Sequence, residues 1–169
     1  MGPNDKLQLE VVGTRRRDAQ DPVSVEDRWH IGSCGKSITA LLYARLVSSG
    51  RAEWRVPIAQ LLPDIAGGIH PAWRERTIDE LFVCRSGLAA NLTPGQGENF
   101  RRDCAPLREQ RTAATRAALT GSPGPRGRFV YSNLGYIVIG AIIDRLTESP
   151  FETALAREVW EPLGVTSAG

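Results

Sequence analysis

The sequence predicts a mostly helical chain with one short strand near its N-terminal end. Apolar residues recur at helical spacing in several stretches, whereas they alternate only weakly between Leu7 and Gly13. The 169 residues are 41% hydrophobic and 24% charged, which is typical of a folded domain large enough to bury a core. We therefore expect one helix-rich domain.

The first long helix is expected directly after Ser33, and Gly50 marks its end. Glycine there suits the left-handed position that follows many helix C-termini. A short helix is expected after Thr77, because Thr77 and Glu80 have the spacing of a capping box. The apolar face of the first helix is formed by Ile38, Leu41, Leu42, Leu46 and Val47.

The second half of the chain is expected to alternate loops rich in glycine and proline with helices. Ser149 is expected to cap the last of these helices, with Pro150 in its first turn. The predicted loops cover residues 91–104 and 121–127, and the predicted helices cover 106–119, 134–146 and 149–160.

Charge and hydropathy argue against nucleic-acid binding and against a membrane span. The net charge is +2, and the one basic cluster, residues 15–17, has no aromatic residues interleaved with it. No apolar run has the length of a membrane-spanning helix, and residues 1–10 lack the apolar core of a secretory signal. We expect a cytoplasmic chain, or an exported one if the N-terminus has been trimmed.

The cysteines do not indicate a disulfide framework or a metal site. Cys34, Cys84 and Cys104 are odd in number and have no C-x-x-C spacing, so free thiols are expected. His30 and His70 do not have metal-ligand spacing with them.

Ser33 and Lys36 form the first pattern that indicates chemistry. A serine at the start of a helix and a lysine one turn later lie on one face. A serine hydroxyl needs a neighbouring base to act as a nucleophile, and lysine can serve where its ammonium form is disfavoured. Only two of the 21 basic residues are lysines, and arginine could not act as this base. The simpler alternative is that Ser33 caps the helix, although Gly35 and Lys36 are poor choices for a first helical turn.

Tyr131 and Asn133 form a second pattern, about a hundred residues later, between a loop and an apolar helix. A tyrosine beside the lysine could relay a proton, and the asparagine amide could bind a substrate amide. The alternative is that Tyr131 packs in the core and Asn133 caps the helix.

Together these residues resemble the serine β-lactamase and penicillin-binding-protein family, including its class C-like esterase and D-aminopeptidase relatives. The S-x-x-K motif of that family matches Ser33 to Lys36, and its Tyr-x-Asn motif matches Tyr131 to Asn133. Further similar segments follow in the family's order, from about residue 7 to the end of the chain: 29–33, 77–81, 85–88 and 162–166.

The resemblance implies an α+β fold of the β-lactamase/transpeptidase type and a covalent acyl-enzyme mechanism. It assigns Ser33 as nucleophile, Lys36 as activating base, Tyr131 as proton relay and Asn133 as a substrate-amide contact. The main-chain N–H of Ser33 would supply half of an oxyanion hole. It implies no cofactor and no metal, and it implies a small ester, amide or β-lactam substrate.

One part of the family pattern is missing. No Lys-Thr-Gly or His-x-Gly motif follows Asn133, and Cys84 stands where many relatives have histidine. We expect residues 1–169 to be a partial domain, mostly the helical subdomain with one or two N-terminal strands, whose partner is the rest of the same fold. The alternative to a working hydrolase is a catalytically incompetent fragment or a non-catalytic binding remnant.

Overall fold

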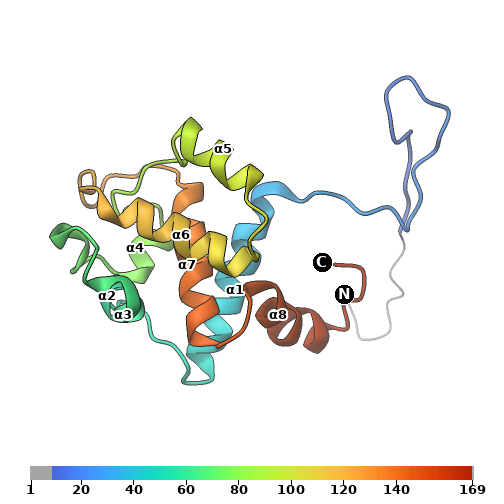
Figure 1. Ribbon diagram of the computed structural model, residues 1–169. Helices are drawn as coiled ribbons and strands as arrows, with labels where there is room; N and C mark the ends of the chain where they lie inside the picture. The colour runs from blue at the N-terminus through green and yellow to red at the C-terminus, as the bar shows by residue number, and fades with distance from the viewer. Residues whose placement is uncertain (1–8, 169) are drawn as a thin grey trace.

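A computed structural model describes residues 9–168 of the chain. Its centre is α7 (Asn133–Leu146), which is buried on most sides and is surrounded by α1 (Gly35–Ser48), α4 (Ile78–Phe82) and α6 (Leu107–Thr120) (Figure 1). The other helices are short or peripheral: α2 (Ile58–Leu61), α3 (Pro63–Ala66), α5 (Pro94–Arg102) and α8 (Phe151–Leu155). Single 3₁₀ turns cover Gly32–Cys34 (η1), Pro71–Trp73 (η2) and Glu161–Leu163 (η4), and a π turn covers Ala156–Trp160 (η3).

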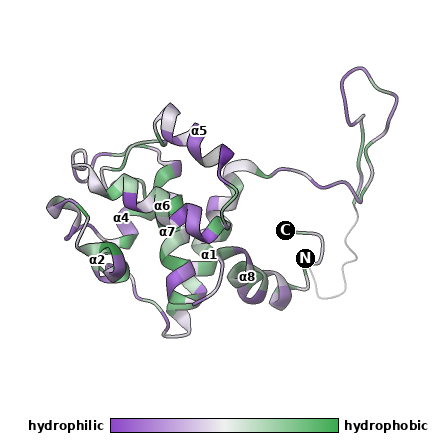
Figure 2. Cartoon of the chain, in the orientation of Figure 1, coloured by the Kyte–Doolittle hydropathy of each residue, from purple (hydrophilic) through white to green (hydrophobic). Residues whose placement is uncertain are grey.

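The core forms where apolar faces of α1, α4 and α6 meet α7. A helix that is apolar over most of its surface is stable in water only when other helices cover it. Most residues of α7 are buried, and Figure 2 shows much of this helix in green. Fully buried members from these helices are Leu42, Tyr43, Leu46, Ile78, Leu81, Leu119, Val138, Ile139, Ile142 and Ile143. No helix within residues 9–168 is both long enough and apolar enough to cross a bilayer.

The local signals at Gly50 and at Thr77 are confirmed. Gly50 has φ +72°, its N–H donates to the carbonyl of Val47, and Arg51 N–H donates to the carbonyl of Leu46, which is a Schellman arrangement. At α4, Thr77 N–H donates to the Glu80 carboxylate at 2.8 Å, as the capping box requires.

The loop predicted over 91–104 is wrong in part, because α5 occupies Pro94–Arg102. Thr93 N–H donates to Gln96 Oε1 at 3.0 Å and Gln96 N–H donates to Thr93 Oγ1 at 3.4 Å, so this helix also begins with a capping box. At the start of α8 the correction is smaller: Pro150, not Ser149, occupies the N-cap position.

The predicted N-terminal strand is wrong over residues 9–13, and residues 7 and 8 lie outside the described part. The only β pairing within residues 9–168 consists of two isolated bridges, Thr14 to Pro22 and Pro57 to Thr77. An extended segment becomes a strand only when a neighbour completes its hydrogen bonds. The segment makes one such bond, from Val23 N–H to the Gly13 carbonyl at 3.1 Å, and Figure 1 shows it in a loop that extends away from the helices, so the pairing does not grow into a ladder. The described residues are therefore mostly helical, as predicted, and an α+β sandwich is not formed within them.

Candidate active site

Ser33 and Lys36 lie one turn apart where η1 continues into α1, and their side chains meet. Lys36 Nζ lies 3.3 Å from Ser33 Oγ, as the S-x-x-K spacing predicts. No side-chain hydrogen bond caps η1 or α1, so Ser33 does not act as a helix cap. Its hydroxyl is exposed and faces other polar groups.

Tyr131 reaches the same serine from a distant part of the chain. Its hydroxyl donates to Ser33 Oγ at 2.7 Å across 98 positions of sequence. The Tyr131 side chain is not part of the core, because 46% of the residue is exposed. The alternative of a packing role for Tyr131 is therefore wrong.

Asn133 contacts Lys36 rather than capping α7. Its Oδ1 accepts from Lys36 Nζ at 2.7 Å, and its Nδ2 donates to Asn91 Oδ1 at 2.8 Å. Ser132 caps α7 in its place, because Ser132 Oγ accepts from Gly135 N–H at 2.9 Å. The structure thus brings all four predicted residues into one hydrogen-bonded cluster.

Residues 89–91 hold the start of α7 in position. The Ala90 carbonyl accepts from the main-chain N–H groups of Asn133 and Leu134, and the Ala89 carbonyl accepts from Ser132 Oγ at 2.6 Å. Because these bonds fix the first turn of α7, they also fix the position of the Asn133 main chain, from which its side chain extends.

The segment that leads to Tyr131 is held by residues 84–87. Gly127 N–H donates to the Arg85 carbonyl at 2.9 Å, and Val130 N–H donates to the Cys84 carbonyl at 2.9 Å. Cys84 is buried, as expected for a packing residue. Gly87 has φ +87°, and a Cβ there would clash with the Gly124 carbonyl oxygen, so only glycine allows this close approach.

Two tyrosine rings surround the Lys36 ammonium. Its Nζ lies 4.9 Å from the ring centre of Tyr131 and 5.3 Å from that of Tyr136. Hydrogen bonding with Lys36 and then with Ser33 lowers the pKa of Tyr131, since both favour the phenolate. Burial raises the pKa of Tyr136, whose hydroxyl donates to the Phe82 carbonyl at 3.2 Å. The two phenols therefore differ electrostatically, because their pKa values shift in opposite directions.

Asn91 and Tyr136 are site residues that the sequence reasoning missed. Tyr136 follows Asn133 by three positions, a spacing that places both on one face of a helix, so this signal was available. Asn91 carried no local signal, because its contact with Asn133 depends on how a loop packs against the start of α7.

Solved structures place the helices in a known fold. The penicillin-binding protein from Bacillus halodurans matches with a TM-score of 0.73 at 22% identity, over 98% of this chain and 51% of that one. The octameric penicillin-binding protein homologue from Pyrococcus abyssi matches with a TM-score of 0.70 at 28% identity, over 91% of this chain and 35% of that one.

Curated relatives that are similar in sequence include proteins of the same kinds as the structural neighbours. Esterase EstB from Burkholderia gladioli is 30% identical over 93% of this chain and 42% of its own length. Penicillin-binding protein 4 from Amycolatopsis lactamdurans is 28% identical over 90% of this chain and 39% of its own length. The chain thus spans less than half the length of these relatives. The Beta-lactamase family model matches residues 3–169, and the chain belongs to that family.

Proposed function

We propose that the chain carries the nucleophile-bearing part of a serine hydrolase that works through a covalent acyl-enzyme. The observation that carries this proposal is the double contact on one hydroxyl: Ser33 Oγ accepts from Tyr131 at 2.7 Å and lies 3.3 Å from Lys36 Nζ. A nucleophile within reach of two proton-transfer groups is the arrangement that acyl transfer requires.

In the proposed reaction Lys36, as the neutral amine, takes the Ser33 proton while Oγ bonds to the substrate carbonyl carbon. Tyr131 passes a proton to the leaving group as its bond to that carbon breaks, and Lys36 returns a proton to Tyr131. A water molecule then attacks the acyl-enzyme, and its proton restores the Ser33 hydroxyl as the acid product leaves. The lowered pKa of Tyr131 supports this relay, because it eases the release of the phenol proton.

Asn133 is proposed to contact the substrate amide. Asn91 occupies one of its donors and Lys36 occupies its oxygen, which leaves the second Nδ2 hydrogen for a substrate carbonyl. The Ser33 main-chain N–H is proposed as one oxyanion donor. A second donor would come from the family's third motif, and the loss of one donor typically costs about 10²- to 10³-fold in rate.

The proposed substrates are small esters, amides or β-lactams. This range follows from the family and from its named relatives, which include an esterase and a penicillin-binding protein. We further propose that residues 1–169 are the helical part of an α+β sandwich whose sheet would complete the site.

A catalytically incompetent fragment is the second candidate, and one observation favours it. Ser33, Asn133 and nearly half of Tyr131 are open to water, whereas charge stabilisation in acyl transfer is strongest in a water-excluded site. This candidate predicts that no probe acylates Ser33 in this chain.

Intact-mass measurement after incubation with a fluorophosphonate, and separately with benzylpenicillin, decides between the two. We expect one adduct that disappears in Ser33→Ala and persists in Ser37→Ala, because Ser37 is an exposed serine in the first turn of α1, four positions after Ser33. Lys36→Arg should slow the labelling by about 10²-fold or more, since arginine retains the charge but cannot accept a proton. Absence of an adduct in a folded chain, or an adduct that survives in Ser33→Ala, would overturn the proposal.

A further inference from the structure

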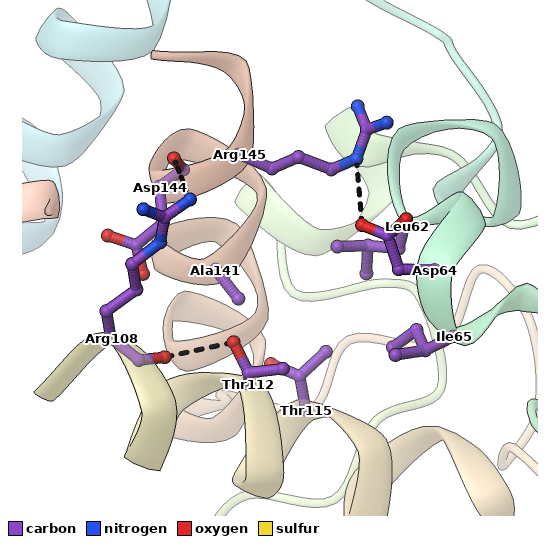
Figure 3. A pocket seen from close by; sticks show the side chains of 9 residues that line it. All are labelled: Leu62, Asp64, Ile65, Arg108, Thr112, Thr115, Ala141, Asp144 and Arg145. Atoms are coloured by element: carbon purple, nitrogen blue, oxygen red, sulfur yellow. Dashed lines mark hydrogen bonds and ion pairs between the residues drawn. The ribbon is translucent and has the colours of Figure 1, made fainter. Parts of the chain in front are cut away.

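The cavity between α3, α6 and α7 offers no set of polar groups that converges on one ligand. Its volume is about 100 Å³, and Figure 3 shows the guanidinium groups of Arg108 and Arg145 pointing to different sides. The Thr112 hydroxyl is already paired, because it donates to the Arg108 carbonyl at 2.9 Å. A feature with more direct chemical consequences is the contact between Lys36 and the ring of Tyr136, which the proposed reaction does not use.

Lys36 carries its amine on a flexible stem of four carbons, so other groups must keep that amine beside Ser33. Nζ lies 3.3 Å from Ser33 Oγ and 2.7 Å from Asn133 Oδ1. Among the described side chains, no carboxylate forms an ion pair with Lys36. The charged form of this amine is therefore held by neutral groups, which are the Asn133 oxygen and two aromatic rings.

The two rings near Lys36 have different parts to play. Nζ lies 4.9 Å from the ring centre of Tyr131 and 5.3 Å from that of Tyr136, and both distances are short enough for a ring face to attract an ammonium group. Tyr131 is exposed and transfers a proton in the proposed reaction, whereas Tyr136 is half-buried and transfers none. Tyr136 is thus the ring that can stay unchanged while the amine gains and loses its charge.

The Tyr136 ring is itself anchored to the core. Its hydroxyl donates to the Phe82 carbonyl at 3.2 Å, and its ring meets the Phe82 ring edge-to-face at 5.9 Å and 89°. The Phe82 ring packs in turn at 5.2 Å against Tyr43, which is fully buried. A ring with this support is rigid enough to restrain a flexible side chain.

We propose that Tyr136 is a positioning residue of the acyl-transfer site, and that its ring keeps Lys36 Nζ beside Ser33. The role belongs to the ring face and not to the hydroxyl, because the hydroxyl bonds to Phe82 while the ring lies next to the ammonium. This inference rests on the proposed function, since it gives Tyr136 a part in the reaction of Ser33. Without the ring, Lys36 would occupy more rotamers, and Nζ would spend less time within reach of Ser33.

The rate at which a fluorophosphonate labels Ser33 in the 169-residue chain tests the proposal. Tyr136→Leu should slow labelling about fivefold, the change expected when one cation–π contact is lost, whereas Tyr136→Phe keeps the ring and should stay within about twofold of the parent. Phe151→Leu is the matched control, because it removes another half-buried ring that faces a cation, 5.7 Å from Arg111. It should leave the rate unchanged.

Proton NMR of the lysine ε-methylene group adds a measurement that does not depend on labelling. The chain has only two lysines, Lys6 and Lys36, so a Lys6→Arg background leaves one such group to follow. A side chain held in one position gives two different shifts for these protons, whereas fast exchange among rotamers averages them. Two shifts are expected with tyrosine or phenylalanine at position 136, and one averaged shift is expected in Tyr136→Leu.

The proposal fails if Tyr136→Leu labels as fast as the parent, or if Tyr136→Phe labels as slowly as Tyr136→Leu. It also fails if the two ε-methylene shifts persist in Tyr136→Leu or are already averaged in the parent. If the parent chain forms no Ser33 adduct, the proposed function fails, and the NMR comparison alone decides whether Tyr136 restrains Lys36. Circular dichroism checks that each variant is folded, and Tyr136→Met, which fills space without a ring, replaces Tyr136→Leu if that variant is not.

Discussion

Replacing Asp144 with alanine should strongly destabilise the chain, because Asp144 ties three helices together. Its side chain is only 2% exposed. It accepts from Arg111 of α6 at 2.8 and 2.9 Å and from the main-chain N–H of Phe151 at the start of α8, while Asp144 itself lies in α7. The substitution would remove three hydrogen bonds and leave a largely buried guanidinium without its main partner.

The magnitude follows from the environment of the two charges. Removal of one partner from a buried ion pair costs about 3–5 kcal/mol. Arg111 would retain Glu152, at 2.7 and 3.1 Å, so we expect a loss of free energy of unfolding near the lower end, about 3 kcal/mol. This is a large share of the roughly 5–15 kcal/mol of a typical domain, and it corresponds to a fall in Tm of about 6–12 °C.

Glu152→Ala is the matched control, because Glu152 binds the same guanidinium from a side chain that is 50% exposed. Surface ion pairs contribute about 0–1 kcal/mol, so Glu152→Ala should be nearly neutral. Urea unfolding followed by circular dichroism compares the two variants. Equal losses in both, or a loss below about 1 kcal/mol in Asp144→Ala, would refute the claim that burial decides the strength of this ion pair.

Two other measurements address the candidate site and its support. In a pH titration of the tyrosine Cζ signals by NMR, Tyr131 should ionise first, below the ordinary pKa of tyrosine, because the neighbouring lysine favours its phenolate. Tyr43 should ionise near pH 12, because burial raises its pKa. A Tyr131 midpoint at or above the ordinary value would contradict the geometry. Gly87→Ala should lower the free energy of unfolding by at least about 2 kcal/mol, because φ is +87° and the new Cβ would meet the Gly124 carbonyl. Gly121→Ala, where no atom lies within 4 Å of the new Cβ and φ is −79°, should change it by less than about 0.5 kcal/mol, and similar losses at both positions would argue against this close approach.

Features that depend on neighbouring residues could be predicted from the sequence. The end of α1 at Gly50, the capping box at Thr77 and the facing of Ser33 and Lys36 all follow from contacts within five positions. The same kind of signal was present at Thr93 and Gln96, where the glycine and proline content of the segment concealed a helix start. Local backbone geometry is sufficient for such features, so they need no knowledge of the fold.

Tertiary structure decided which polar residues became a cluster. Asn133 and Ser132 are both suitable helix caps, and the choice between them depended on the Ala89 carbonyl, which engages Ser132 and leaves Asn133 free for Lys36. The contact with Asn91 and the approach of Tyr131 to Ser33 likewise join segments 42 and 98 positions apart.

The segment predicted as a strand also shows that local sequence does not determine long-range pairing. Its weak alternation of apolar and polar residues is compatible with an extended backbone, yet residues 9–13 form no ladder. A helix satisfies its own main-chain hydrogen bonds within four residues, so its sequence can largely specify it. A strand needs hydrogen-bond partners, and a multi-residue site needs side chains, from distant parts of the chain. Only the packing of the whole chain determines whether those groups come close enough to interact.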